Sequence, residues 1–121
     1  TKTNKLTELI RRTNKARREN KALQRTNNIQ FCRIDNDQLL AYLKSSADRS
    51  NHVVAVVNLD QHGVQSGLVH LPLHLVGLPA DAHYQVYDLI TGARYTWQGE
   101  WNYVELNPDY LPVHLFRIET L

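Results

Sequence analysis

A valine-rich run near the middle of the sequence, residues 53–59, limits the folds open to this chain more than any other feature. Its first part reads VVAVV, with no polar side chain. β-Branched residues favour strands, and apolar side chains at successive positions point to both faces of a strand. The run therefore predicts a central strand that is covered on both faces.

Further short segments after residue 27 have the length and patterning of β-strands, with turn signals such as Asp35-Asn36-Asp37 and Ile90-Thr91-Gly92 between them. They comprise residues 29–34, 39–44, 65–73, 83–88, 94–97, 101–106 and 113–119. No strand is followed by a second helical stretch, which argues against a parallel α/β sheet. The pattern predicts a mainly β sandwich or barrel.

The first part of the chain reads instead as a helix over residues 4–20. Leu6, Leu9, Ile10, Ala16 and Leu23 recur at roughly helical spacing, and neither proline nor glycine interrupts the stretch. The apolar stripe is thin, so such a helix would not be stable alone. We expect it to need a partner surface.

Charge is divided unevenly between the helix and the rest of the chain. Residues 1–25 contain nine basic and two acidic residues, a charge of +7, and the remainder carries −5. A basic helix could contact nucleic-acid phosphates. Known nucleic-acid-binding signatures are absent, and Glu8 and Glu19 allow local pairing. We therefore interpret the charge as a solvated helix face and predict no nucleic-acid partner.

The polar residues give no reason to predict catalysis or metal binding. Glycoside hydrolysis needs two facing carboxylates, whereas the aspartates here are scattered through turns. Pro72 between His70 and His74 disfavours the helix on which such a spacing would bind metal. We predict no catalytic residue, no metal site and no cofactor. No membrane span or signal peptide is predicted, and the single cysteine, Cys32, is interpreted as a buried hydrophobe.

The aromatic residues suggest a different kind of site. Trp97, Trp101 and Tyr103 lie within a short stretch, and exposed rings of this kind could stack on sugars. Burial in a two-sheet core is the commoner fate of such rings. A stand-alone carbohydrate-binding module that uses Trp97, Trp101 and Tyr103 is therefore an alternative function.

The sequence begins at Thr1 and contains no methionine. We therefore expect the chain to be a piece of a longer protein.

Two groups of residues carry a resemblance to a known family. The segment from Asn14 to Gln24, NKARRENKALQ, resembles the last helix of the catalytic barrel in α-amylase-type enzymes. The rest is similar to the C-terminal domain of α-1,4-glucan:maltose-1-phosphate maltosyltransferases. The matching motifs are DND with LAY, VVNLD, YDLITG, YTWQG, NYVEL and PVHLF, which begin at residues 35, 40, 56, 87, 95, 102 and 112 respectively.

The resemblance implies an antiparallel two-sheet β-sandwich of the amylase C-terminal type. It divides the chain into the last helix of a catalytic barrel plus a linker, residues 1–25, and a C-terminal sandwich domain, residues 26–121. The helix stripe is then expected to face a (β/α)8 barrel in the same polypeptide. None of the family's catalytic residues falls on this sequence, so the piece itself is expected to be a non-catalytic structural domain.

The resemblance also implies properties of the parent enzyme. It would transfer a maltosyl unit from α-maltose 1-phosphate to an α-1,4-glucan with retention of configuration, using an Asp nucleophile and a Glu acid/base on the barrel. The parent is expected to be a homodimer in the bacterial cytoplasm, and contact between this piece and α-glucan is a further expectation.

Overall fold

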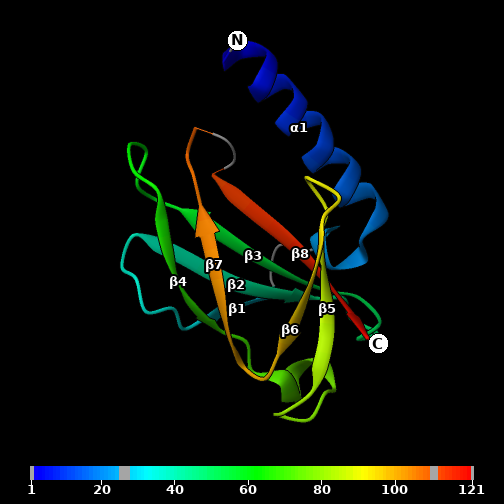
Figure 1. Ribbon diagram of the computed structural model, residues 1–121. Coiled ribbons are helices and arrows are strands. Elements are labelled where there is room, and N and C mark those ends of the chain that lie inside the picture. The colour runs from blue at the N-terminus through cyan, green and yellow to red at the C-terminus, as the bar shows by residue number, and fades with distance from the viewer. Residues whose placement is uncertain (1, 25–27, 110–111, 121) are drawn as a thin grey trace.

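The computed structural model describes residues 2–24, 28–109 and 112–120, and Figure 1 shows their arrangement. Within these ranges one α-helix precedes eight strands. The elements are α1 (Lys2–Glu19), η1 (Lys21–Gln24), β1 (Ile29–Cys32), β2 (Leu39–Ser45), β3 (His52–Asn58), β4 (Gln65–His70), η2 (Leu73–Val76), β5 (His83–Asp88), β6 (Arg94–Gln98), β7 (Trp101–Leu106) and β8 (Val113–Thr120). The predicted mainly β fold with an N-terminal helix is confirmed. None of the helices in this part of the chain is long and apolar enough to cross a membrane.

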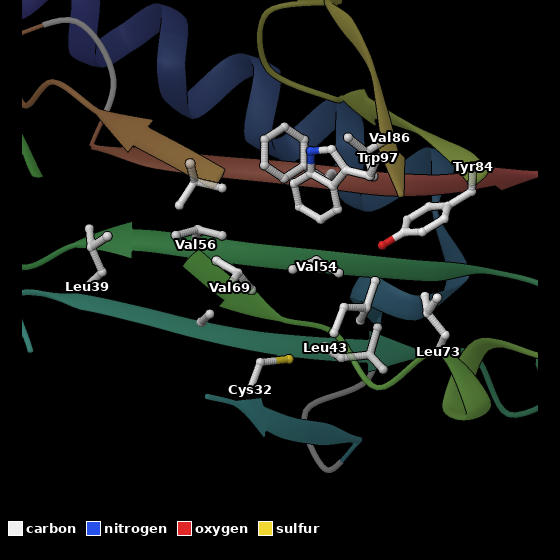
Figure 2. Packing of buried hydrophobic residues seen from close by; sticks show 14 of the residues in the cluster. Cys32, Leu39, Leu43, Val54, Val56, Val69, Leu73, Tyr84, Val86 and Trp97 are labelled. Carbon is white, nitrogen blue, oxygen red and sulfur yellow. The ribbon is translucent and has the colours of Figure 1, made fainter. Parts of the chain in front are cut away.

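The strands form two antiparallel sheets. The larger sheet has the order β1-β2-β3-β8-β5-β6, and the smaller sheet consists of β4 and β7. Inward side chains of both sheets, among them Val54, Val69 and Val104, meet in one core (Figure 2). The alternation of each strand supplies these inward residues, because successive side chains point to opposite faces. The two-sheet sandwich expected from the family resemblance is confirmed.

β3 lies between β2 and β8 and is covered on both faces, as the valine-rich run predicts. Val54 and Val56 point into the core between the sheets. Val53 and Ala55 point the other way, into a second apolar cluster with residues of α1, η1 and β8. All four side chains are almost completely buried. The central strand therefore carries an apolar layer on each side.

The helix packs on the outer face of the larger sheet, which differs from the expectation that its stripe faces a separate barrel. Ala16 is buried in the second cluster, and Leu9 packs against that cluster beside Ile90 and Leu115. Ile10 lies on another side of the helix and is 52% exposed. The side chain of Leu6 lies outside the described part of the structure. The sequence could not identify this partner surface, because Val53 and Ala55 are distant along the chain.

A pair of asparagines, Asn20 and Asn51, connects the end of α1 to the hairpin between β2 and β3. Asn51 Nδ2 donates to Asn20 Oδ1 at 3.1 Å, and Asn51 Oδ1 accepts from the backbone N–H of Ala22 at 3.0 Å. Asn20 Nδ2 in turn donates to the carbonyl of Ala16 at 2.9 Å. Asn20 and Ala22 are buried, so these hydrogen bonds satisfy polar groups that water cannot reach. We call this arrangement the asparagine clasp.

The sandwich departs from the predicted strands in two places. The predicted strand 65–73 ends at His70, because Pro72 has no N–H to donate and Leu73 begins the short helix η2. The predicted strand 29–34 leaves the larger sheet after Cys32, and Ile34 pairs with Val69 of β4. Residues 33–35 therefore extend the smaller sheet at its β4 edge.

We predict that Asn51→Ala lowers the free energy of unfolding by about 2–3 kcal/mol, because the buried Asn20 Oδ1 and the Ala22 N–H both lose their partner. Urea unfolding followed by circular dichroism measures the change. The control is Asn14→Ala at an exposed helix position, which should shift stability by less than about 0.5 kcal/mol. Equal effects of the two substitutions would contradict the role given to the clasp.

Candidate functional site

Trp97 does not lie on an exposed aromatic surface. It occupies the inner face of β6, is 6% exposed, and packs edge-on against Tyr84 and Phe116, with ring centroids 6.2 Å and 5.3 Å away. Figure 2 shows its indole among the core side chains. The expected three-residue platform is therefore corrected at this position, because a ring in the inter-sheet core cannot present its face to a sugar. Tyr95 shares the face of Trp97 by strand alternation, but it is 47% exposed.

Trp101 and Tyr103, in contrast, lie two residues apart on the outer face of β7. They are 46% and 60% exposed, respectively. In the register of the smaller sheet Trp101 is opposite His70, and Tyr103 is opposite the exposed Leu68. The structure therefore brings two of the three predicted residues together on one solvent-facing sheet surface. Whether they bind sugar stays a prediction.

The segment 33–35 forms the border of this surface. The N–H of His70 donates to the carbonyl of Arg33 at 2.8 Å, and the N–H of Asp35 donates to the carbonyl of Leu68 at 3.3 Å. Asp35 Oδ1 also accepts from the N–H of Leu68 at 2.7 Å. A Cβ on Gly67 would lie 2.6 Å from that oxygen, so a side chain at residue 67 would displace the Asp35 carboxylate. Gly67 thus leaves room for the Asp35 side chain to pack against β4.

Trp101 is held at one end of the surface by polar neighbours. The ring of His70 lies 4.8 Å from its ring, centroid to centroid, and the guanidinium of Arg33 lies 5.9 Å from the Trp101 ring centroid. His70 Nε2 lies 3.2 Å from Glu100 Oε1, while Glu100 Oε2 accepts from the N–H of Leu73 at 3.0 Å. The Leu73 N–H and His70 lower the pKa of Glu100 below its ordinary value. A carboxylate therefore fixes His70 against the indole.

Tyr103 borders two depressions, one on the outer face of the smaller sheet and one between β7 and the strands β6 and β8 of the larger sheet. The first has a volume of about 740 Å³ and is shallow; Leu68 and Tyr103 supply its apolar side, and its remaining lining is Asp35, Asn36, Asp37, Ser66 and Gly67. The second has a volume of about 300 Å³ and is lined by Tyr95, Trp97, Tyr103, Val104, Glu105, His114 and Phe116. Because Tyr103 borders both, its ring stands as a ridge between them.

The polar lining residues were not predicted as site residues. Asp35, Asn36 and Asp37 read in the sequence only as a turn, and the turn is present: Asn36 Oδ1 accepts from the N–H of Gln38 at 2.8 Å. Nothing in the local sequence indicates that this turn lies beside Tyr103. The only available signal is the i, i+2 spacing of Trp101 and Tyr103, which places their side chains on one face of a strand.

Two aspartates away from this surface, Asp60 and Asp88, serve a turn and the core. Asp60 Oδ1 accepts from the N–H of His62 at 2.9 Å. Asp88 is buried: its Oδ1 accepts from the N–H of Ile90 at 2.9 Å, and its Oδ2 lies 3.0 Å from His114 Nδ1. Within residues 2–24, 28–109 and 112–120 no group of three or more His, Cys, Asp or Glu side chains is placed to hold a metal ion.

Some basic side chains of α1 pair with acidic side chains of the same helix. Glu8 contacts both Arg11 and Arg12, with Arg12 Nε 2.7 Å from Glu8 Oε1, and Lys15 lies 4.0 Å from Glu19. Arg12 Nη1 also donates to the carbonyl of Ile90 at 2.7 Å. The local pairing expected from Glu8 and Glu19 is therefore present, and one arginine fastens α1 to the sandwich.

Burial raises the pKa of the Cys32 thiol from 9.0 to about 11. At about pH 8 the native protein then has roughly one hundredth of the thiolate present in the unfolded chain. We predict that a disulfide reagent labels the native protein about a hundredfold more slowly than protein in denaturing urea. Absorbance of the released thiol measures both rates. Equal rates would show that Cys32 is accessible and ionised, contrary to its position in the core.

Comparison with known sequences matches residues 31–118 to the family described as GLGE, C-terminal. An α-1,4-glucan:maltose-1-phosphate maltosyltransferase of Chlorobaculum tepidum is 43% identical over 111 residues, and its counterpart in Salinibacter ruber is 45% identical over 108 residues. These alignments cover 87% and 89% of the chain but only 17% and 16% of the relatives. The chain therefore spans about one sixth of the length of these curated relatives.

Solved structures with similar folds include two amylases. The chain matches part of the maltogenic α-amylase AmyB of Thermotoga neapolitana with a TM-score of 0.67 and 10% identity, covering 93% of the chain and 25% of the enzyme. An Anoxybacillus α-amylase matches with a TM-score of 0.62 and 11% identity, covering 91% of the chain and 21% of that enzyme. At such low identity these likenesses establish the fold alone.

Proposed function

The chain belongs to the GLGE C-terminal family, and we propose that it is the non-catalytic C-terminal domain of an enzyme that transfers maltosyl units from maltose 1-phosphate to α-1,4-glucan. The observation that carries the proposal is the match to two maltosyltransferases at 43–45% identity over nearly the whole chain. The resemblance of the segment from YDLITG to NYVEL to the C-terminal domain of such maltosyltransferases supports it.

The carboxylates favour a catalytic centre elsewhere in the proposed enzyme. Asp60 and Asp88 accept backbone N–H groups of their own turns, and Asp35 accepts one from β4. A nucleophile and an acid/base would instead have to face a common substrate position. A (β/α)8 barrel needs about 200 residues or more, so it would occupy part of the length that the relatives have beyond this chain.

We further propose that α1 is the last helix of that barrel and that residues 26–121 form the separate sandwich domain. The proposed boundary, between residues 25 and 26, lies outside the described residues. Leu9 and Ala16 face the sandwich, while the exposed Ile10 faces away from it and is available to a second body. On this proposal the helix is shared between the two domains.

An exposed apolar patch at one edge of the larger sheet, which we call the wing, would extend the same interface. Ile29 and Phe31 of β1 and Leu40 of β2 are exposed on the outer face, where Phe31 lies edge-on to Tyr42 at 6.3 Å. This is the face on which α1 packs at Val53 and Ala55. Exposed apolar side chains that gather on one face commonly mark an interaction surface.

The position of Arg17 relative to Lys44 indicates which side of α1 faces the wing. Burial, together with the positive charge of Arg17, lowers the pKa of Lys44, a residue of β2. Arg17 and Ile10 are seven residues apart and share a helix face. Ile10 and the wing of Ile29, Phe31 and Leu40 would therefore border the same space, which we propose the barrel fills.

The resemblance also leads us to propose a bacterial cytoplasmic location and a homodimer whose interface other regions build. Nucleic-acid binding is not proposed, because Glu8 pairs with Arg11 and Arg12, Glu19 pairs with Lys15, and Arg12 also binds the Ile90 carbonyl.

The activity itself is tested by expressing the complete proposed enzyme and this chain side by side. With maltose 1-phosphate and maltoheptaose, we expect the complete enzyme to release inorganic phosphate as the glucan lengthens, and the isolated chain to release none. Phosphate release and chain-length analysis by mass spectrometry provide the measurement. Release by the isolated chain, or none from the complete enzyme, would contradict the proposal.

The proposed barrel contact predicts that Phe31→Asp acts differently in the two proteins. In the isolated chain Phe31 is 63% exposed, so we expect a loss of about 1 kcal/mol or less. In the complete enzyme the carboxylate would be buried, and the loss should reach about 3 kcal/mol. Thermal unfolding of both proteins measures the difference. Val64→Asp, at an exposed position outside the wing, is the control and should act alike in both.

A further inference from the structure

We propose that the outer face of the smaller sheet is a contact site for α-1,4-glucan, centred on Tyr103 and distinct from the barrel-facing side of the domain. This inference goes beyond the structural role proposed above, but the choice of an α-1,4-glucan as the ligand rests on that proposed function. The family match and the relatives' names assign no binding role to this surface.

The position of Tyr103 carries the proposal. Its side chain is 60% exposed and borders both depressions of the surface. A chain-like ligand that crosses from one depression to the other must therefore pass over or beside this ring. An aromatic face offers a large, rigid apolar area at little conformational cost, which suits the apolar faces of a sugar ring.

Neighbouring residues extend the apolar area along two directions. Leu68 lies directly opposite Tyr103 across the smaller sheet. Trp101 lies two residues along β7, a separation of about 7 Å, and is kept in place by His70 and Arg33. On the other side Tyr95 contributes an exposed ring to the second depression. Several successive sugar units could thus meet an apolar surface.

Polar groups around Tyr103 match the hydroxyl groups of such a ligand. Asp37 and Ser66 line the first depression, and their side chains have no hydrogen-bond partner among residues 2–24, 28–109 and 112–120. Asp35 is positioned by its bond to the Leu68 N–H. Glu105 is exposed on the same strand face as Tyr103. Sites that combine an apolar floor with a few fixed polar groups are typical of small-molecule recognition.

The chemistry favours a glucan over a second protein as the occupant. Around Tyr103 the first depression combines carboxylates and a hydroxyl with Leu68, and the second, between β7 and the larger sheet, adds the ring of Tyr95 and the carboxylate of Glu105. The aliphatic and aromatic wing of Ile29, Phe31 and Leu40 lies instead on the other sheet, where Lys44, opposite Ile29, is a cation and no carboxylate lines the wing strands β1 and β2. A neutral polyol suits the first surface, and an apolar domain contact suits the second.

Both contacts can be made at once. The smaller sheet covers the inner face of the larger one, whereas α1 covers its outer face, and Figure 1 shows β4 and β7 away from α1. A glucan bound at Tyr103 would therefore leave the proposed barrel contact undisturbed.

The test is a titration of this 121-residue chain with maltoheptaose, followed by amide resonances in heteronuclear NMR spectra. We expect shifts at millimolar sugar for Tyr103, Ser66, Leu68 and Asp35, and none for β1. Tyr103→Ala should weaken binding by about tenfold or more, whereas Tyr103→Phe, which keeps the ring, should stay within about threefold. Phe31→Ala is the matched control, because Phe31 is exposed to a similar degree, 63% against 60%, and its binding should equal that of the unmodified chain.

Several results would overturn the proposal: no shifts at millimolar maltoheptaose, equal binding by Tyr103→Ala, shifts centred on Phe31, or equal binding of the β-1,4-linked cellohexaose. Chemical-shift changes that depend on the protein concentration and not on the sugar concentration would show a contact between copies of the chain and would also overturn the proposal. Ser66→Arg fills the first depression without touching the core and should weaken binding even if Tyr103→Ala unfolds. Because binding is measured on this chain and maltosyl transfer on the complete enzyme, either proposal can fail alone.

Discussion

The two-sided burial of β3 is the constraint on which the rest of the structure depends. Val54 and Val56 need the smaller sheet above them, and Val53 and Ala55 need α1 and η1 below. A strand with only one covered face would expose two of these four side chains, at a cost of about 1.5 kcal/mol or more for each valine. The helix is therefore part of the fold of this domain as well as a proposed link to another.

This layered arrangement gives the domain two sides with different chemistry. On the helix side the apolar side chains of Ile10 and Phe31 are exposed beside the basic residues of α1. On the side of the smaller sheet the rings of Trp101 and Tyr103 stand among carboxylates, a hydroxyl and the His70–Glu100 pair. None of these exposed side chains belongs to either apolar cluster, so each side can interact with a partner without disturbing β3.

The sequence predicted the elements well because their signals are local. The valine-rich run, the turns and the helical spacing each indicate their element within a short window, and the strand bounds agree to within a few residues. Contacts between distant segments were not predictable in this way. The docking of Ala16 beside Val53 and Ala55, and the passage of residues 33–35 from one sheet to the edge of the other, depend on such contacts.

The candidate site was likewise predictable only where its signals are local. The exposure of Trp101 and Tyr103 follows from strand alternation, since β7 places Val104 and Leu106 inward. Alternation does not explain the burial of Trp97, because Tyr95 shares its face of β6 and is exposed. Trp97 is buried because it packs against Tyr84 and Phe116, which are distant along the chain. The position of Asp35 beside Leu68 could not be foreseen, because it requires the chain after β1 to leave the larger sheet and Gly67 to leave room for the carboxylate.

The asparagine clasp has a mechanical consequence. It fixes α1 at its C-terminal end, where Asn20 meets Asn51, and the helix continues for 18 residues from there, or about 27 Å at 1.5 Å per residue. A tilt of about 5° at the clasp would carry the far end through about 2 Å, a displacement that close-packed side chains would feel. The Arg12 hydrogen bond to Ile90 and the packing of Leu9 and Ala16 oppose such a tilt along the helix. The clasp and these contacts together set the angle at which anything held by the far end of the helix meets the sandwich.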